Sequence, residues 1–490
     1  MSVEKEKNTK QSIFKSRGFK FGTLATALTA ILIIVVIAAN MVLSVLSDKF
    51  AWSFDLTSTD MYDISDATKT IVETLDKDVE IKITVFCAED DFPYFLREPL
   101  KRFSNLSNQI SYSYVDLEKN PAAATQFGTE YSITTYSVAI TSGDRVKVYN
   151  VSDYYQEDTE GSGAVDISIE EKLAAGTLYV TKEDIPVVYF VGGHGEDGYT
   201  SLMNLIANNG ADVEAINLAT EKVEFSPYSK LMVICNPIRD YSEAEIRLIE
   251  DFLNNGNKFG RNLMFFSSAE NYELPNLEKF LAAWGFKFNK DTVYDDTNNY
   301  GQIATSVIPE LATDEIMNTG KKLSSVTASI IPGTRSIDLL FEESGLFATQ
   351  EIFASNTDTS YSRDASVISN EPGRLPADKS GPHCTMALSM KYKYENNIQV
   401  QSYVLASGST EMLGDAYLKY TGNGEVLMQL YKLMMNEQDD TIASAKKTKS
   451  AIAATVTATQ MKVVAIVTLG VIPLIFLIAG VVVYIRRRFL

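Results

Sequence analysis

The residues best suited to chemistry are five consecutive ones, Gly192-Gly193-His194-Gly195-Glu196. They directly follow the apolar run 187–191, which is typical of a strand buried on both faces of a parallel sheet. Open α/β sheets bind ligands at the carboxyl ends of such strands. There the glycines let the backbone approach a ligand, while His194 and Glu196 supply an imidazole and a carboxylate. We predict a ligand-binding or partner-binding site at Gly192, Gly193, His194, Gly195 and Glu196, with no catalytic residue. A structural turn explains the same residues as well.

The other chemical motifs in the sequence are weak. The glycine run matches neither GxGxxG nor the P-loop, because its spacing differs and no Lys-Ser/Thr pair follows it. Two histidines and three scattered cysteines argue against a His-rich metal centre and a disulfide scaffold. The pair Asp295-Asp296 has oxygen ligands for Ca²⁺ but lacks the EF-hand spacing, so a solvated turn is the default. We predict no cofactor and no metal.

A cysteine nucleophile is also disfavoured. Cys235 ends an apolar, strand-like run, but Asn236-Pro237 does not form the small-residue elbow that exposes a nucleophile. His383 and Cys384 lie in a polar region, and only the fold could bring them near Cys235. Buried free thiols are the better interpretation, although one disulfide remains open.

Two domains are expected to hold these residues. Alternating strands and helices over 53–183 predict a small α/β domain, with a hairpin around Ser142-Gly143-Asp144. Over 184–440, strands near 187–191, 211–218, 231–235 and 263–266 alternate with helices, one of which opens with the capping box Ser242-Glu243-Ala244-Glu245. This order predicts a doubly wound, Rossmann/flavodoxin-like parallel sheet. A polar segment at 355–382 is expected to be a mobile loop.

Two long apolar stretches, 21–46 and 463–485, bracket these domains and contain no charged residue. Each is long enough to cross a bilayer as a helix. Basic residues in the tails, 1–20 and 486–490, favour a cytoplasmic location for both ends. We expect a two-pass protein of the cell membrane with two transmembrane helices, a large extracytoplasmic region and a juxtamembrane segment at 441–462. A cleaved signal peptide is the alternative for 21–46.

The chain is strongly acidic. Its formal charge is −19, and because the two tails contribute +4 and +3, the remainder carries −26. Such a surface repels nucleic acid, so a nucleic-acid partner is excluded. The acidity is typical of a solvated face that keeps an exposed domain soluble.

Several segments resemble the GldG-type auxiliary subunits of ABC transporters, a gliding-motility-associated or uncharacterised ABC transport component. The segment Tyr189-Phe190-Val191 with Gly193-His194-Gly195-Glu196 is similar to the family's strand and GHGE signature. Asp55-Leu56-Thr57 resembles the family's opening, and Trp284-Gly285-Phe286 its later segment. Leu117 stands where the family usually has a proline. The resemblance covers most of the chain and supplies no catalytic residue.

The resemblance implies partners: an ABC-2-type permease and a separate cytoplasmic ATPase, since this chain has no Walker A lysine loop. We therefore expect a membrane-anchored, extracytoplasmic, non-enzymatic accessory subunit that binds the permease and possibly an exported substrate of the cell envelope. The alternatives are an extracytoplasmic hydrolase acting through His194 and Glu196, and a glycan-binding protein, which only the abundant tyrosines suggest.

Overall fold

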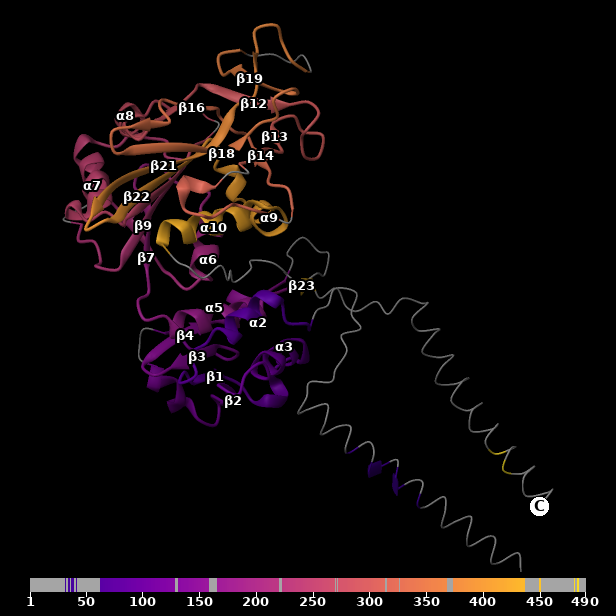
Figure 1. Ribbon diagram of the computed structural model, residues 1–490. Helices are drawn as coiled ribbons and strands as arrows, with labels where there is room; N and C mark the ends of the chain where they lie inside the picture. Colours follow the sequence, from indigo (N-terminus) through magenta and orange to yellow (C-terminus); the bar gives the residue numbers. More distant parts are fainter. Residues whose placement is uncertain are drawn as a thin grey trace, which may run out of the picture. The chain divides into compact units, whose positions relative to one another are not determined.

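The computed structural model describes most of the chain between residues 62 and 436, and these residues form a mixed α/β fold with several sheets (Figure 1). Short gaps in this range lie at 128–130, 158–164, 220–222, 269, 271, 313–314, 326 and 368–372. Outside it, residues 31, 34, 35, 37, 38, 41, 449, 450, 480 and 483 are also described.

The prediction of two transmembrane helices is corrected. Among the described residues, no helix has the length and apolar character that a membrane crossing requires. The expected two-pass location in the cell membrane is wrong on the same finding. A bilayer crossing requires one continuous apolar helix of about 20 residues, and only six residues of 21–46 are among those described. The rest of that stretch, most of 463–485, both tails and most of 441–462 lie outside the described residues.

A four-stranded sheet lies in the first half of the described chain, with the order β2-β1-β3-β4. In β1, Ile81, Ile83 and Val85 are buried while the residues between them are more exposed, so one face of this strand packs on the core. Ser65 caps the helix α2 by accepting a bond from the Thr68 amide. The elements of this part are α2 (Asp66–Glu73), β1 (Ile81–Val85), α3 (Tyr94–Ser104), β2 (Ile110–Tyr114), β3 (Val138–Ser142), β4 (Arg145–Tyr149), α4 (Val151–Tyr154), β5 (Tyr155–Glu157), β6 (Val165–Ile167) and α5 (Ile169–Thr181).

The second half of the chain is built on a nine-stranded sheet. Its order is β14-β18-β21-β22-β10-β9-β7-β8, and β17 pairs with β18 beside this path. Strands β22, β10, β9, β7 and β8 run parallel, whereas β14, β18 and β21 continue the sheet with antiparallel pairs. The sheet is therefore mixed and not the purely parallel sheet that the sequence predicts. The strands are β7 (Val187–Gly192), β8 (Asp212–Asn217), β9 (Ser229–Cys235), β10 (Asn262–Phe266), β14 (Glu310–Leu311), β17 (Glu343–Ser344), β18 (Phe347–Ala354), β21 (Cys384–Glu395) and β22 (Ile398–Ser407).

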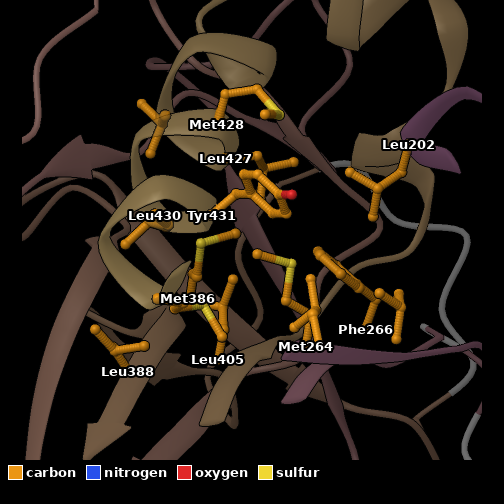
Figure 2. Packing of buried hydrophobic residues seen from close by; sticks show 14 of the residues in the cluster. Leu202, Met264, Phe266, Met386, Leu388, Leu405, Leu427, Met428, Leu430 and Tyr431 are labelled. Atoms are coloured by element: carbon orange, nitrogen blue, oxygen red, sulfur yellow. The ribbon is translucent and has the colours of Figure 1, made fainter. Parts of the chain in front are cut away.

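Both faces of this sheet are buried. Along β7, Val188 and Phe190 enter one apolar cluster, while Val187, Tyr189 and Val191 enter the other. The first cluster packs against α6 and α10, as the side chains in Figure 2 show, and the second packs against α7 and α8. A strand buried on both faces has no polar side to alternate with, which explains the continuous apolar runs in the sequence. The helices are α6 (Thr200–Ala207), α7 (Glu243–Asn254), α8 (Pro275–Ala283), α9 (Asp415–Tyr420) and α10 (Asn423–Met435).

The segment 355–382, expected to be a mobile loop, contains two strands that join β12 in a three-stranded sheet. Arg363 forms a buried ion pair with Asp378 at 2.7 Å, and its guanidinium lies over the rings of Tyr294 and Tyr361. Tyr294 and Asp378 lie in other strands or turns than Arg363, so local composition gave no sign of these two contacts. The small strands of this region are β11 (Phe286–Phe288), β12 (Asp291–Asp295), β13 (Ser306–Val307), β15 (Ile331–Pro332), β16 (Ile337–Leu339), β19 (Ser360–Asp364) and β20 (Lys379–Ser380), and β23 (Lys449–Ser450) pairs with β6.

Substitution of Leu405 tests the core. This side chain is fully buried in the first cluster (Figure 2). In the sheet, Leu405 lies opposite Met264 of β10 and Leu388 of β21. We expect Leu405→Ala to lower the free energy of unfolding by about 3 kcal/mol, since it removes buried methyl groups and leaves a cavity. Urea titration followed by circular dichroism measures the change. Leu340→Ala, at a 48% exposed leucine, is the control, and equal losses for both variants would contradict this packing.

Candidate functional site

The predicted Gly-Gly-His-Gly-Glu site lies where the topology of the sheet reverses. Strand β7 has β8 on one side and β9 on the other, both parallel to it. The helix after β7, α6, packs on one face of the sheet, whereas α7, which follows β9, packs on the opposite face. The carboxyl ends of β7 and β9 therefore flank a switch point, the place where open α/β sheets bind ligands.

The glycines shape the loop that leaves β7. Gly193 and Gly195 have φ angles of +115° and +84°, which other residues rarely adopt. A side chain at Gly195 would collide with Ile238 in the loop after β9, and one at Gly193 would press on Asn217 at the end of β8. The two glycines thus let the loop lie closely between its neighbours on either side.

His194 is enclosed by two carboxylates. Its Nδ1 lies 3.3 Å from Glu196 Oε1, and its Nε2 lies 3.2 Å from Glu245 Oε1 on the first turn of α7. The ring of Tyr241 stacks on the imidazole with centroids 3.9 Å apart. His194 is 7% exposed. His194 Nδ1 and Glu245 Oε1 are buried and have no hydrogen-bond partner in the described part of the chain, so these contacts are close approaches and not hydrogen bonds.

Each carboxylate has further donors. Glu196 accepts from the His194 amide at 2.6 Å and from the Tyr241 hydroxyl at 2.5 Å. Glu245 accepts from the Ser242 amide at 2.8 Å, which completes the capping box of α7. Burial raises the pKa of Glu245, but the hydrogen bonds from Ser242 and the charge of His194 together bring it below its ordinary value. Burial and the charge of Glu196 raise the pKa of Tyr241, which therefore stays a neutral donor.

The loops after β7 and β9 are bonded to each other. The His194 carbonyl accepts from the amides of Ile238 and Arg239 at 3.0 and 3.1 Å. The Arg239 guanidinium donates to the Gly193 carbonyl at 2.9 Å, and the Asn236 side chain donates to Asp197 at 2.6 Å. These four hydrogen bonds join the loop after β7 to the loop after β9.

This arrangement is poorly suited to acid-base or nucleophilic chemistry. A catalytic acid or base must come within hydrogen-bond reach of its substrate, but the His194 side chain is 9% exposed and the Glu196 side chain is fully enclosed. Cys235, at the end of β9, is buried, and burial raises the pKa of its thiol well above the ordinary value. A thiol in that state is a weak nucleophile.

The other candidates from the sequence are His383, the cysteines and Asp295, and their contacts are those of ordinary loops and strands. His383 lies 3.3 Å from the Lys379 carbonyl, and no hydrogen bond or ion pair among the described residues joins it to Cys235. All three cysteines are free. Asp295 accepts from the amides of Thr297 and Asn298, which is the pattern of a turn. Where the chain is described, no group of three or more His, Cys, Asp or Glu is arranged to hold a metal.

Two members of the site were missed by sequence reasoning. Glu245 is recognisable as the capping residue of α7, but its contact with His194 joins distant parts of the chain and has no local signal. Tyr241 directly precedes the capping serine and belongs to the apolar cluster of α7 and α8. Its stacking on His194 could not be expected without the fold.

Comparison with known proteins gives little about function. The family model "Domain of unknown function (DUF7088)" matches residues 58–152, the region of the four-stranded sheet. No curated protein matches the chain. Among solved structures, one titled "mmIFT52 N-terminal domain" has 14% identity and a TM-score of 0.37, covering 52% of this chain and 99% of that chain. None of these matches refers to GldG-type subunits or to ABC transport.

Glu245→Gln tests the electrostatics of the site. Because the pKa of Glu245 is lowered in the folded state, its charge stabilises the fold above its ordinary value of 4.5, and this stability is lost as pH falls through the lowered pKa. We expect the variant to lose about 2 kcal/mol of unfolding free energy at neutral pH. The loss should shrink at acidic pH below the ordinary value.

The control is Glu243→Gln in the same helical turn, where the side chain is 79% exposed. Urea unfolding at several pH values measures both variants. A deficit for Glu245→Gln that is independent of pH, or one matched by Glu243→Gln, would contradict the paired carboxylate.

Proposed function

We propose that the chain is a non-enzymatic accessory subunit of an ABC-2-type transport assembly, and that it binds its partners through the surface at the carboxyl ends of β7 and β9. The observation that carries this proposal is the enclosure of His194 and Glu196 by each other, Tyr241 and Glu245. Side chains held in this way stabilise a loop and do not reach a substrate.

The outward side of the same loops supports a binding role. Gly193 and Gly195 are exposed above the buried His194, and Ile238 is 42% exposed beside them. Exposed backbone next to an apolar side chain gives a partner both hydrogen-bonding groups and a hydrophobic contact. The bonds between the two loops fix this surface before binding, which lowers the entropy cost of association.

The proposed partners are an ABC-2-type permease and a separate ATPase. The resemblance of Tyr189-Phe190-Val191 and Gly193-His194-Gly195-Glu196 to GldG-type subunits supports this choice. The sequence has no Walker A motif, so ATP hydrolysis in such an assembly belongs to another polypeptide.

The hydrolase alternative is less well supported. It requires His194 and Glu196 to act directly on a bond of the substrate, but both side chains are enclosed. His194 Nε2 faces Glu245, and Glu196 Oε1 accepts a hydrogen bond from the Tyr241 hydroxyl. The atoms that would transfer a proton are therefore not open to a bond of the substrate.

Affinity purification of the full chain from its own cells tests the proposal. We expect an ABC-2-type permease and a Walker A-containing ATPase to co-isolate, as identified by mass spectrometry. Ile238→Asp should reduce their recovery about tenfold, which corresponds to roughly 1.4 kcal/mol, because it places a charge at the centre of the proposed surface.

Ile303→Asp is the matched control, since Ile303 is 55% exposed in a different loop. Absence of both partners from the wild-type preparation would overturn the proposed function. An equal reduction by both substitutions would show that the surface near Ile238 has no special role.

A further inference from the structure

The hairpin of β21 and β22 extends beyond the strands on either side of it. The pairing of β18 with β21 ends at Phe347 and Lys391, and that of β10 with β22 begins at Leu263 and Val404. The turn residues Asn396 and Asn397 have φ angles of +49° and +65°. Two consecutive positive values in a two-residue loop define a type I′ turn, which joins the two strands tightly. The end of the hairpin is therefore a well-ordered two-stranded ribbon.

Among the described residues, no strand pairs with the outer edge of β21 near Tyr394. The Tyr392 amide donates to Leu346 at 3.0 Å, so this residue directs its backbone groups away from β22. The backbone N–H and C=O of successive residues along a strand point alternately to its two sides. Tyr394, two residues after Tyr392, therefore directs its N–H and C=O to the same outer side. Beyond Leu346, no strand of the described residues covers that side. Tyr394 is 66% exposed and Leu346 is 51% exposed.

We propose that this edge pairs with the same edge of a second copy of the chain. In an antiparallel pair centred on Tyr394, each Tyr394 lies opposite its counterpart, and the two residues exchange their free backbone hydrogen bonds. Each Lys393 then lies opposite Glu395 of the other copy. An edge strand with free backbone groups and exposed apolar side chains is suited to such pairing.

The charge pattern favours a second copy over an unrelated strand. Two-fold symmetry requires an edge to complement itself, and the sequence Lys393-Tyr394-Glu395 does so, because it places opposite charges on either side of the central tyrosine. Lys393 and Glu395 lie 2.9 Å apart within one chain, so in the pair each also gains a partner from the other copy. Facing tyrosines and facing opposite charges both stabilise antiparallel strands.

The proposed contact is small, and the chain carries a net charge of −19. Repulsion between two acidic bodies opposes association at low salt, and a short strand pair buries less area than a permanent interface. The dimer is therefore weak and depends on protein concentration. The opposite charges on either side of the central Tyr394 pair fix its register.

Cysteine cross-linking tests the register. In a hydrogen-bonded antiparallel pair the facing Cα atoms lie about 5.5 Å apart, which suits a disulfide. We expect the full-length Tyr394→Cys variant to form a disulfide-linked dimer under mild oxidation. Tyr300→Cys, at a 55% exposed site elsewhere, is the control, and the native cysteines are buried. Equal cross-linking of both variants, or none at residue 394, would overturn the proposal.

Charge reversal gives an independent test by sedimentation velocity. In a dimer of Lys393→Glu, the new glutamate at residue 393 faces Glu395 of the other copy. In a dimer of Glu395→Lys, the new lysine faces Lys393. Each variant alone should therefore be monomeric at concentrations where the wild type dimerises. An equimolar mixture of the two should dimerise again, because opposite charges face each other in the mixed pair. A wild type that stays monomeric at every concentration, or a mixture that does not associate, would contradict pairing between copies.

Discussion

An imidazole held between two buried carboxylates determines what the switch point of the sheet can do. His194 connects the loop after β7 to the first turn of α7 through Glu196 and Glu245, and Tyr241 covers the ring. A buried carboxylate is stabilised by hydrogen bonds, and Glu196 and Glu245 accept them from the Tyr241 hydroxyl and the Ser242 amide. The same surroundings enclose the His194 and Glu196 side chains, which supports the proposal that they stabilise a binding surface.

The sheet beneath makes this arrangement possible. Because β7 and β9 are buried on both faces, their carboxyl ends are held in register, and the loops that leave them meet at one edge. The antiparallel extension through β21 has a different consequence. It gives the sheet a long hairpin whose edge at Tyr394 no other described strand covers, and this edge is where we propose pairing with a second copy.

Local patterns in the sequence predicted local structure well. Apolar runs located β7, β9 and β10, and Ser242 with Glu245 located the start of α7. Contacts between distant residues were not predictable: Glu245 beside His194 and the pairing of β18 with β21 join separate segments of the chain and have no local signal. The membrane prediction is wrong on the finding that no helix among the described residues has the length and apolar character to cross a bilayer.

A double-mutant cycle between His194 and Glu245 tests the central claim most directly. The unfolding free energies of the wild type, His194→Gln, Glu245→Gln and the double variant are measured by urea titration at neutral pH. A buried contact at 3.2 Å between the two side chains predicts a coupling energy of at least about 1 kcal/mol. Strictly additive effects would show that His194 does not depend on Glu245, and the account of a locked, non-catalytic switch point would be contradicted.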